Sequence, residues 1–125
     1  MNAHALAQKA YAATNSSIKT PRAIEYEAIA RVTHDLKKSA AHKKKNFPKF
    51  AEAVYRNNQL WTTLAANVVD DANELPPQIR AQIFYLSEFT KRHAAQVLAG
   101  TASVGPLLEI NAAILRGLRQ EGTPQ

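Results

Sequence analysis

The chain has 125 residues, a formal net charge of +6 at pH 7 and no cysteine. The missing cysteines exclude disulfides and thiolate metal sites, and they fit a reducing compartment, so we expect a cytoplasmic protein. No run of about 18 apolar residues is present, and the first residues lack the apolar segment of a signal peptide, so we expect no membrane partner.

Apolar residues recur at helical spacing in five segments and almost never alternate, which predicts an all-α protein. The first expected helix, over residues 3–14, is short and alanine-rich, and residues 15–17 interrupt it. Thr20 and Pro21 then form a start signal, because Thr caps a helix and Pro suits its first position. The second expected helix has as its buried face Tyr26, Ile29, Val32, Leu36 and Ala40.

The third expected helix restarts the chain at Pro48, runs to about Val69 and carries the most regular stripe of the sequence. The stripe has spacings of four, three, four, three and four, and it consists of Phe50, Val54, Asn57, Trp61, Leu64 and Val68. These positions share one face of a helix, which is apolar except at Asn57 and includes the only tryptophan. Such a face needs cover from other helices.

The fourth expected helix opens after Leu75 at the Pro76-Pro77 pair, and Gly100 follows it at the place of a C-terminal glycine cap. Its expected buried face is Ile79, Ile83, Leu86, Phe89, His93 and Val97. The fifth helix starts at Pro106, and its stripe is Leu107, Ile110, Ile114 and Leu118.

Short connections make successive helices antiparallel neighbours. We therefore expect one domain over residues 1–125, an antiparallel bundle of three long helices with a short helix at each end. Residues 1–19 would hold the short first helix and its break, and residues 121–125 a frayed tail.

The net charge comes from one connection, between the second and third expected helices. Six lysines lie there within thirteen residues that contain no acid: Lys37, Lys38, Lys43, Lys44, Lys45 and Lys49. Three interpretations are open: a solvated helix end without a partner, a site for the phosphates of RNA or DNA, and a surface that steers an acidic protein partner. The nucleic-acid interpretation has little other support, because no known nucleic-acid module is visible.

Motifs of catalysis and metal binding are missing from the sequence. There is no glycine-rich phosphate loop, and His4, His34, His42 and His93 do not pair with carboxylates at metal-ligand spacing. We therefore expect no enzyme activity, no metal and no cofactor. For His93, on the edge of an apolar face, we favour a packed histidine that is hydrogen-bonded to a neighbour over a ligand.

Asn57 and Trp61 each allow two interpretations. Asn57 is either a buried amide that is paired inside the bundle and fixes helix register, which we favour, or a partner-binding amide at a groove. Trp61 is either plain core, again the favoured interpretation, or an anchor at an interface, where tryptophan is enriched.

The order and spacing of several short motifs go further than periodicity, and through them the chain resembles the FlaF family of alphaproteobacterial flagellar proteins over nearly its whole length. The matching motifs are Ala10-Tyr11; Thr20-Pro21-Arg22 with Ile24-Glu25; Asn57 with Leu60-Trp61 and Leu64-Ala65; Leu75-Pro76 with Ile79-Arg80-Ala81-Gln82-Ile83; Lys91-Arg92-His93; and Leu107-Leu108-Glu109-Ile110-Asn111 with Ile114 and Gly117-Leu118. The lysine-rich connection is not part of the resemblance.

The resemblance implies a non-catalytic regulator or chaperone that binds flagellin in the cytoplasm, is needed for flagellin production and export, and works beside a second regulator, FlbT, which acts on flagellin mRNA. The matched positions give candidate partner-binding residues: Arg22, Glu25, Asn57, Leu60, Trp61, Leu64, Arg80 and Asn111. The alternative function is an RNA-binding regulator that contacts flagellin mRNA through Lys43, Lys44 and Lys45.

Overall fold

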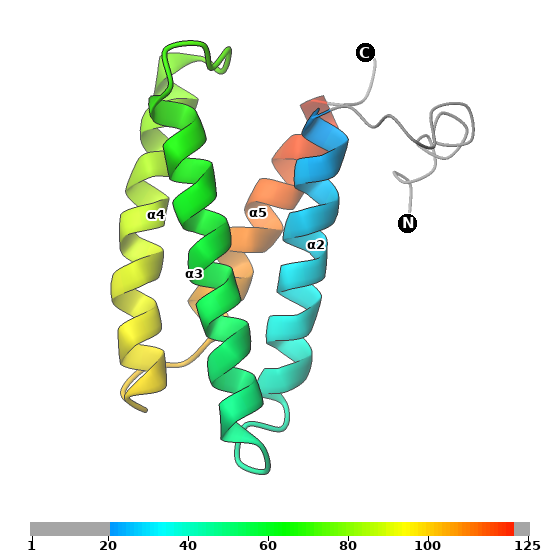
Figure 1. The fold of residues 1–125 in the computed structure, drawn as a ribbon, viewed down its shortest axis with the longest axis vertical. Helices are drawn as coiled ribbons and strands as arrows, with labels where there is room; N and C mark the ends of the chain where they lie inside the picture. The colour runs from blue at the N-terminus through cyan, green and yellow to red at the C-terminus, as the bar shows by residue number, and fades with distance from the viewer. Residues whose placement is uncertain (1–20, 122–125) are drawn as a thin grey trace, which may run out of the picture.

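The computed structural model describes the backbone of residues 21–121 and the side chains of residues 26–117. Four helices form this part of the chain: α2 (Pro21–Ala40), α3 (Phe47–Val69), α4 (Pro77–Leu98) and α5 (Gly105–Glu121) (Figure 1). They confirm the all-α class over these residues. The expected helix over residues 3–14 and the tail beyond Glu121 lie outside the described residues.

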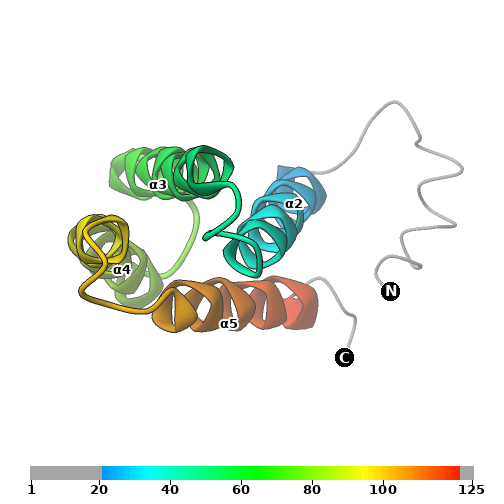
Figure 2. The ribbon, with the colours of Figure 1, turned by 90° about the horizontal axis from the view of Figure 1, so that it is seen from below.

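The first three of these helices run antiparallel and side by side, with α3 in contact with both α2 and α4. The last helix, α5, crosses obliquely behind them and packs mainly on α2 (Figures 1 and 2). The expectation of a short final helix is not confirmed, because α5 has 17 residues, against 20 to 23 in the other three. The helix continues to Glu121, three residues beyond Leu118, the last residue of the expected stripe.

Helix ends follow the expected signals. Asn46 caps α3, since its Oδ1 accepts a hydrogen bond from the Lys49 backbone N–H at 3.3 Å. Gly100 has φ +82°, a left-handed conformation that glycine adopts at little cost, and its N–H donates to the carbonyl of Val97. The Thr101 N–H donates to the carbonyl of Gln96, which completes the two-bond glycine cap that ends α4.

Buried apolar side chains from all four helices meet near the end of the bundle that holds the α2–α3 connection. This apolar core consists of Leu36, Phe50, Ala53, Val54, Ala94, Val97 and Leu107. The expected stripe of α3 is confirmed, because every member is buried except Leu64, which is half-buried. The stripe of α3 is therefore the face on which this helix packs against both α2 and α4.

The face that α4 presents to the bundle differs from the expected one. Its buried residues are Ser87, Thr90, Ala94 and Val97, whereas the larger residues that we expected there are only half-buried: Ile79, Ile83, Leu86, Phe89 and His93. Small side chains let α4 approach α3 closely, and the Ser87 hydroxyl donates a hydrogen bond of 3.2 Å to the backbone carbonyl of Trp61. The close approach of α4 to α3, rather than the apolar area of its side chains, therefore determines which residues of α4 are buried.

None of the helices within residues 21–121 is at once long enough and apolar enough to cross a bilayer.

Candidate functional site

Asn111, on α5, joins three helices through its side-chain amide. Its Oδ1 accepts a hydrogen bond of 2.8 Å from the indole Nε1 of Trp61, and its Nδ2 donates to Asn57 Oδ1 at 2.8 Å and to Thr33 Oγ1 at 3.0 Å. The Thr33 hydroxyl in turn donates to the carbonyl of Ile29 at 2.6 Å. We call Thr33, Asn57, Trp61 and Asn111 the polar centre.

The donors and acceptors of the polar centre fit together in one way only. The indole N–H of Trp61 is a donor alone, so it requires the carbonyl oxygen of Asn111 and fixes the orientation of that amide. The Asn111 amide nitrogen then faces two oxygens, one on α3 and one on α2. Trp61, Asn57 and Asn111 are each 0% exposed. The arrangement therefore fixes how α5 sits against α2 and α3.

This geometry confirms the favoured interpretations of Asn57 and Trp61 as side chains inside the bundle. Both are fully buried, so in this structure neither offers a surface to a partner. The Nδ2 of Asn57 and the Oγ1 of Thr90 are buried without a hydrogen-bond partner in the described part of the chain. A direct partner-binding role for Asn57, Trp61 and Asn111 stays a prediction. In the structure, these three side chains position helices relative to one another.

Sequence reasoning placed Asn111 in a motif but left it off the buried face of α5. The structure centres that face on Leu107 and Asn111, while Ile110 and Ile114 are half-buried. The signal was present, since Leu107, Asn111, Ile114 and Leu118 repeat the spacing of four, three and four that marks α3. A polar residue in such a stripe is a candidate for a buried hydrogen-bond partner.

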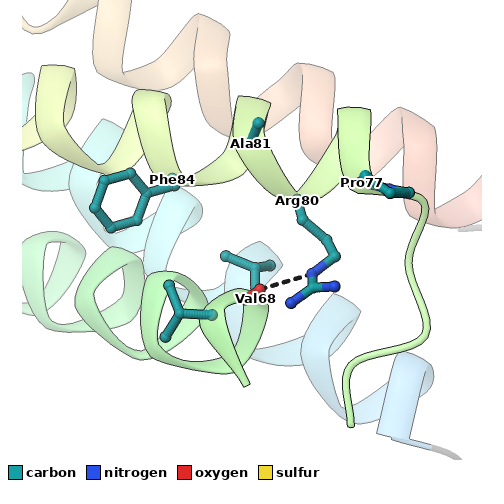
Figure 3. A pocket seen from close by; sticks show the side chains of 6 residues that line it. Val68, Pro77, Arg80, Ala81 and Phe84 are labelled. Atoms are coloured by element: carbon teal, nitrogen blue, oxygen red, sulfur yellow. Dashed lines mark hydrogen bonds between the residues drawn. The ribbon is translucent and has the colours of Figure 1, made fainter. Parts of the chain in front are cut away.

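A second feature is an open hollow of about 370 Å³ between α3 and α4, at the end of the bundle opposite the α2–α3 connection (Figures 1 and 3). It is lined by Val68, Val69, Pro77, Arg80, Ala81 and Phe84, and we call it the α3–α4 hollow. Val69 and Phe84 are 60% and 44% exposed. Apolar side chains here meet solvent around a shallow, open depression.

Arg80 holds one wall of this hollow. Its Nε donates to the carbonyl of Val68 at 2.7 Å (Figure 3). Its Nη2 donates to the carbonyl of Asp70 at 3.1 Å. The last carbonyls of a helix have no partner within the helix, so the guanidinium satisfies the end of α3 and ties α4 to it.

The remaining predicted partner-binding residues do not join these two features. Leu60 and Leu64 are half-buried on α3 and do not line the α3–α4 hollow. Arg22 and Glu25 lie in the first turns of α2, and their side chains are outside the described residues. The candidates thus divide into the buried residues of the polar centre, Arg80 at the hollow, the half-buried Leu60 and Leu64 on α3, and Arg22 and Glu25 at the start of α2.

The histidine prediction is confirmed for His93. Its ring stacks on Phe89 with 5.4 Å between centroids, and its Nε2 donates to the carbonyl of Ser103 at 2.8 Å. This bond ties α4 to the connection that precedes α5. Among the side chains that the structure describes, those of residues 26–117, no group of three or more His, Asp or Glu is placed to hold a metal ion.

Comparison with known families gives one clear match. A model of the flagellar protein FlaF matches residues 7–118 of the chain, which include all four residues of the polar centre and all six residues that line the α3–α4 hollow. No curated protein and no solved structure matches the chain. With nearly the whole sequence covered by the match, the chain belongs to the FlaF family of flagellar proteins.

Proposed function

We propose that this protein is a non-catalytic flagellar regulator that binds flagellin in the cytoplasm and promotes its production and export. The observation that carries the proposal is the FlaF match over residues 7–118. A binding role also agrees with the exposed apolar hollow among the described side chains.

The docking surface that we propose is the α3–α4 hollow, and its occupant is an amphipathic helix from one of the terminal segments of flagellin. Val69 and Phe84 offer exposed apolar area on either side of the hollow, as helix-in-groove recognition requires. The adjoining turn carries the exposed acids Asp70, Asp71 and Glu74. Their charge favours a flagellin helix that has basic residues beside its apolar stripe.

The buried polar centre supports this surface from inside the bundle. Trp61 lies on the same helix as Val68 and Val69, and its backbone carbonyl accepts the hydrogen bond that sets α4 against α3. This hydrogen bond therefore helps to hold α3 and α4, the two helices that line the hollow, in place. A preformed groove of this kind lowers the ordering cost of binding.

The test is a calorimetric titration of purified flagellin into the full chain. The double variant Phe84→Ala with Val69→Thr should weaken binding by more than about tenfold, which corresponds to about 1.4 kcal/mol. Tyr85→Ala is the matched control, because Tyr85 is 62% exposed and adjacent to Phe84 but does not line the hollow.

The titration tests flagellin binding and the position of the docking surface separately. If the parent protein does not bind flagellin, the proposed function is wrong. If the parent binds flagellin and the double variant binds equally well, flagellin docks elsewhere on the molecule.

A further inference from the structure

Six lysines cluster at the α2–α3 connection and the helix ends beside it, and we call them the basic tip: Lys37 and Lys38 in the last turn of α2, Lys43, Lys44 and Lys45 in the connection, and Lys49 in the first turn of α3. Five of them are exposed, and Lys43 is half-buried with its Nζ 5.7 Å from the centre of the Phe50 ring. None forms an ion pair with another described side chain, over residues 26–117, and the nearest acid on α3, Glu52, is paired with Arg56 at 2.9 Å.

The backbone of the connection itself, at residues 41–45, is folded into consecutive turns. The Lys45 and Asn46 N–H groups both donate to the carbonyl of His42 at 3.0 Å, and the His42 N–H donates to the carbonyl of Ser39 at 3.1 Å. These turns surround a second hollow, lined by residues 40–45. The backbone that carries Lys43, Lys44 and Lys45 is therefore ordered, while the interpretation as a solvated helix end without a partner stays open.

The chemistry of the tip fits phosphate. All six cations are lysines, and lysine binds phosphate as a point charge. Phe47 stands among them with 46% of its surface exposed, and its ring centre is 6.0 Å from that of Phe50. An exposed ring beside lysines is the arrangement on which unpaired bases stack.

From these observations we propose that the basic tip binds single-stranded nucleic acid. The lysines neutralise successive phosphates, and an unpaired base stacks on Phe47. This activity is separate from the proposed flagellin site, because the basic tip and the α3–α4 hollow lie at opposite ends of the bundle (Figure 1).

Fluorescence anisotropy with a labelled single-stranded RNA of mixed sequence tests the proposal on the full chain. The affinity should fall about 20-fold between 50 and 200 mM salt if about three phosphates are contacted. The variant Lys44→Gln, Lys45→Gln, Lys49→Gln should weaken binding by more than about tenfold at 50 mM salt and flatten the salt dependence. Lys43 is left in place, because it packs on Phe50.

The matched control removes the same three charges elsewhere. Lys91→Gln, Arg92→Gln and Arg116→Gln alter exposed residues of α4 and α5, and this variant should bind RNA within about threefold of the parent, a margin set by long-range charge alone. Phe47→Ala should weaken binding by roughly fivefold or more without changing the salt dependence. Circular dichroism should show that all variants keep the parent's thermal midpoint.

Three results would overturn the proposal. Equal losses in the two triple variants would mean that net charge alone attracts RNA. Binding of polyglutamate as tight as binding of RNA at the same salt would assign the tip to an acidic protein partner. No RNA binding by the parent at 50 mM salt would leave the tip without a nucleic-acid role.

Discussion

The bundle is held by two different kinds of contact in two neighbouring regions. The apolar core, which includes Leu36, Phe50 and Leu107, buries side chains from α2, α3 and α5 without a directed bond. The polar centre joins the same three helices through side-chain hydrogen bonds of 2.8 to 3.0 Å. Both regions contain fully buried residues, so burial alone does not separate them.

The difference shows what each region contributes. Apolar burial depends on area and tolerates small shifts, so the apolar core supplies stability with little preference for one register of α5. A turn of α5 that moved Asn111 away from Trp61 would leave a buried N–H without a partner, at a cost of about 1–3 kcal/mol. The polar centre therefore selects one position of α5.

The largest expected effect breaks the polar centre at its bulkiest member. Trp61→Ala should lower the free energy of unfolding by roughly 3–5 kcal/mol, because it removes a fully buried ring and leaves Asn111 Oδ1 without its donor. Urea unfolding followed by circular dichroism measures the change. An unfolding midpoint equal to that of the parent would show that the ring contributes little to the bundle.

The second prediction compares two positions one turn apart on α5. Asn111→Leu should cost roughly 2–4 kcal/mol, since the indole N–H of Trp61 and the Oδ1 of Asn57 both lose their partner. Leu107→Met, in the apolar core, should cost less than about 1.5 kcal/mol, because volume is kept. Equal losses in the free energy of unfolding for the two variants would contradict the proposed difference between the polar centre and the apolar core.

The third prediction extends the comparison to the far end of the bundle, where hydrogen bonds from Arg80 tie α4 to α3. Arg80→Gln should lower the free energy of unfolding by roughly 1–2 kcal/mol, because two carbonyls at the end of α3 lose charged donors. Arg92→Gln, an exposed change on the same helix, is the control and should leave the unfolding midpoint unchanged. An equal shift of the unfolding midpoint in the control would contradict the view that the stability lost in Arg80→Gln comes from the hydrogen bonds at the end of α3.

The smallest expected effect concerns two buried serines. Ser87→Ala should cost about 0.5 kcal/mol, because its hydroxyl bonds to a carbonyl of another helix. Ser39→Ala should be neutral or slightly stabilising, since that hydroxyl bonds only to Leu36 within its own helix and alanine is the better helix former. High-precision thermal unfolding separates the two, and a reversed order would contradict the importance of the bond between helices.

Sequence reasoning predicted the parts of the fold that local patterns control. The start of α2 at Pro21, the stripe of α3 and the glycine cap at Gly100 are all present in the structure. Each depends on a backbone preference or on periodicity within one helix, which a single sequence displays.

The parts that sequence reasoning missed depend on contacts between helices. The buried face of α4 contains Ser87 and Thr90, which a pattern of apolar residues cannot select. Asn111 is buried because Trp61 and Asn57 meet it, and those partners lie 50 and 54 residues away. The α3–α4 hollow likewise arises from the way two helices pack, so only the structure could reveal it.

The hydrogen bonds of Asn111 also have a kinetic consequence. They close sequence separations of 50, 54 and 78 residues, whereas α2, α3 and α4 meet through short connections. Closing a long loop costs more entropy than closing a short one, so α5 should dock after the transition state for folding. Loss of the Asn111 amide should then speed unfolding while leaving the folding rate nearly unchanged, which makes this side chain a determinant of how long the folded state lasts.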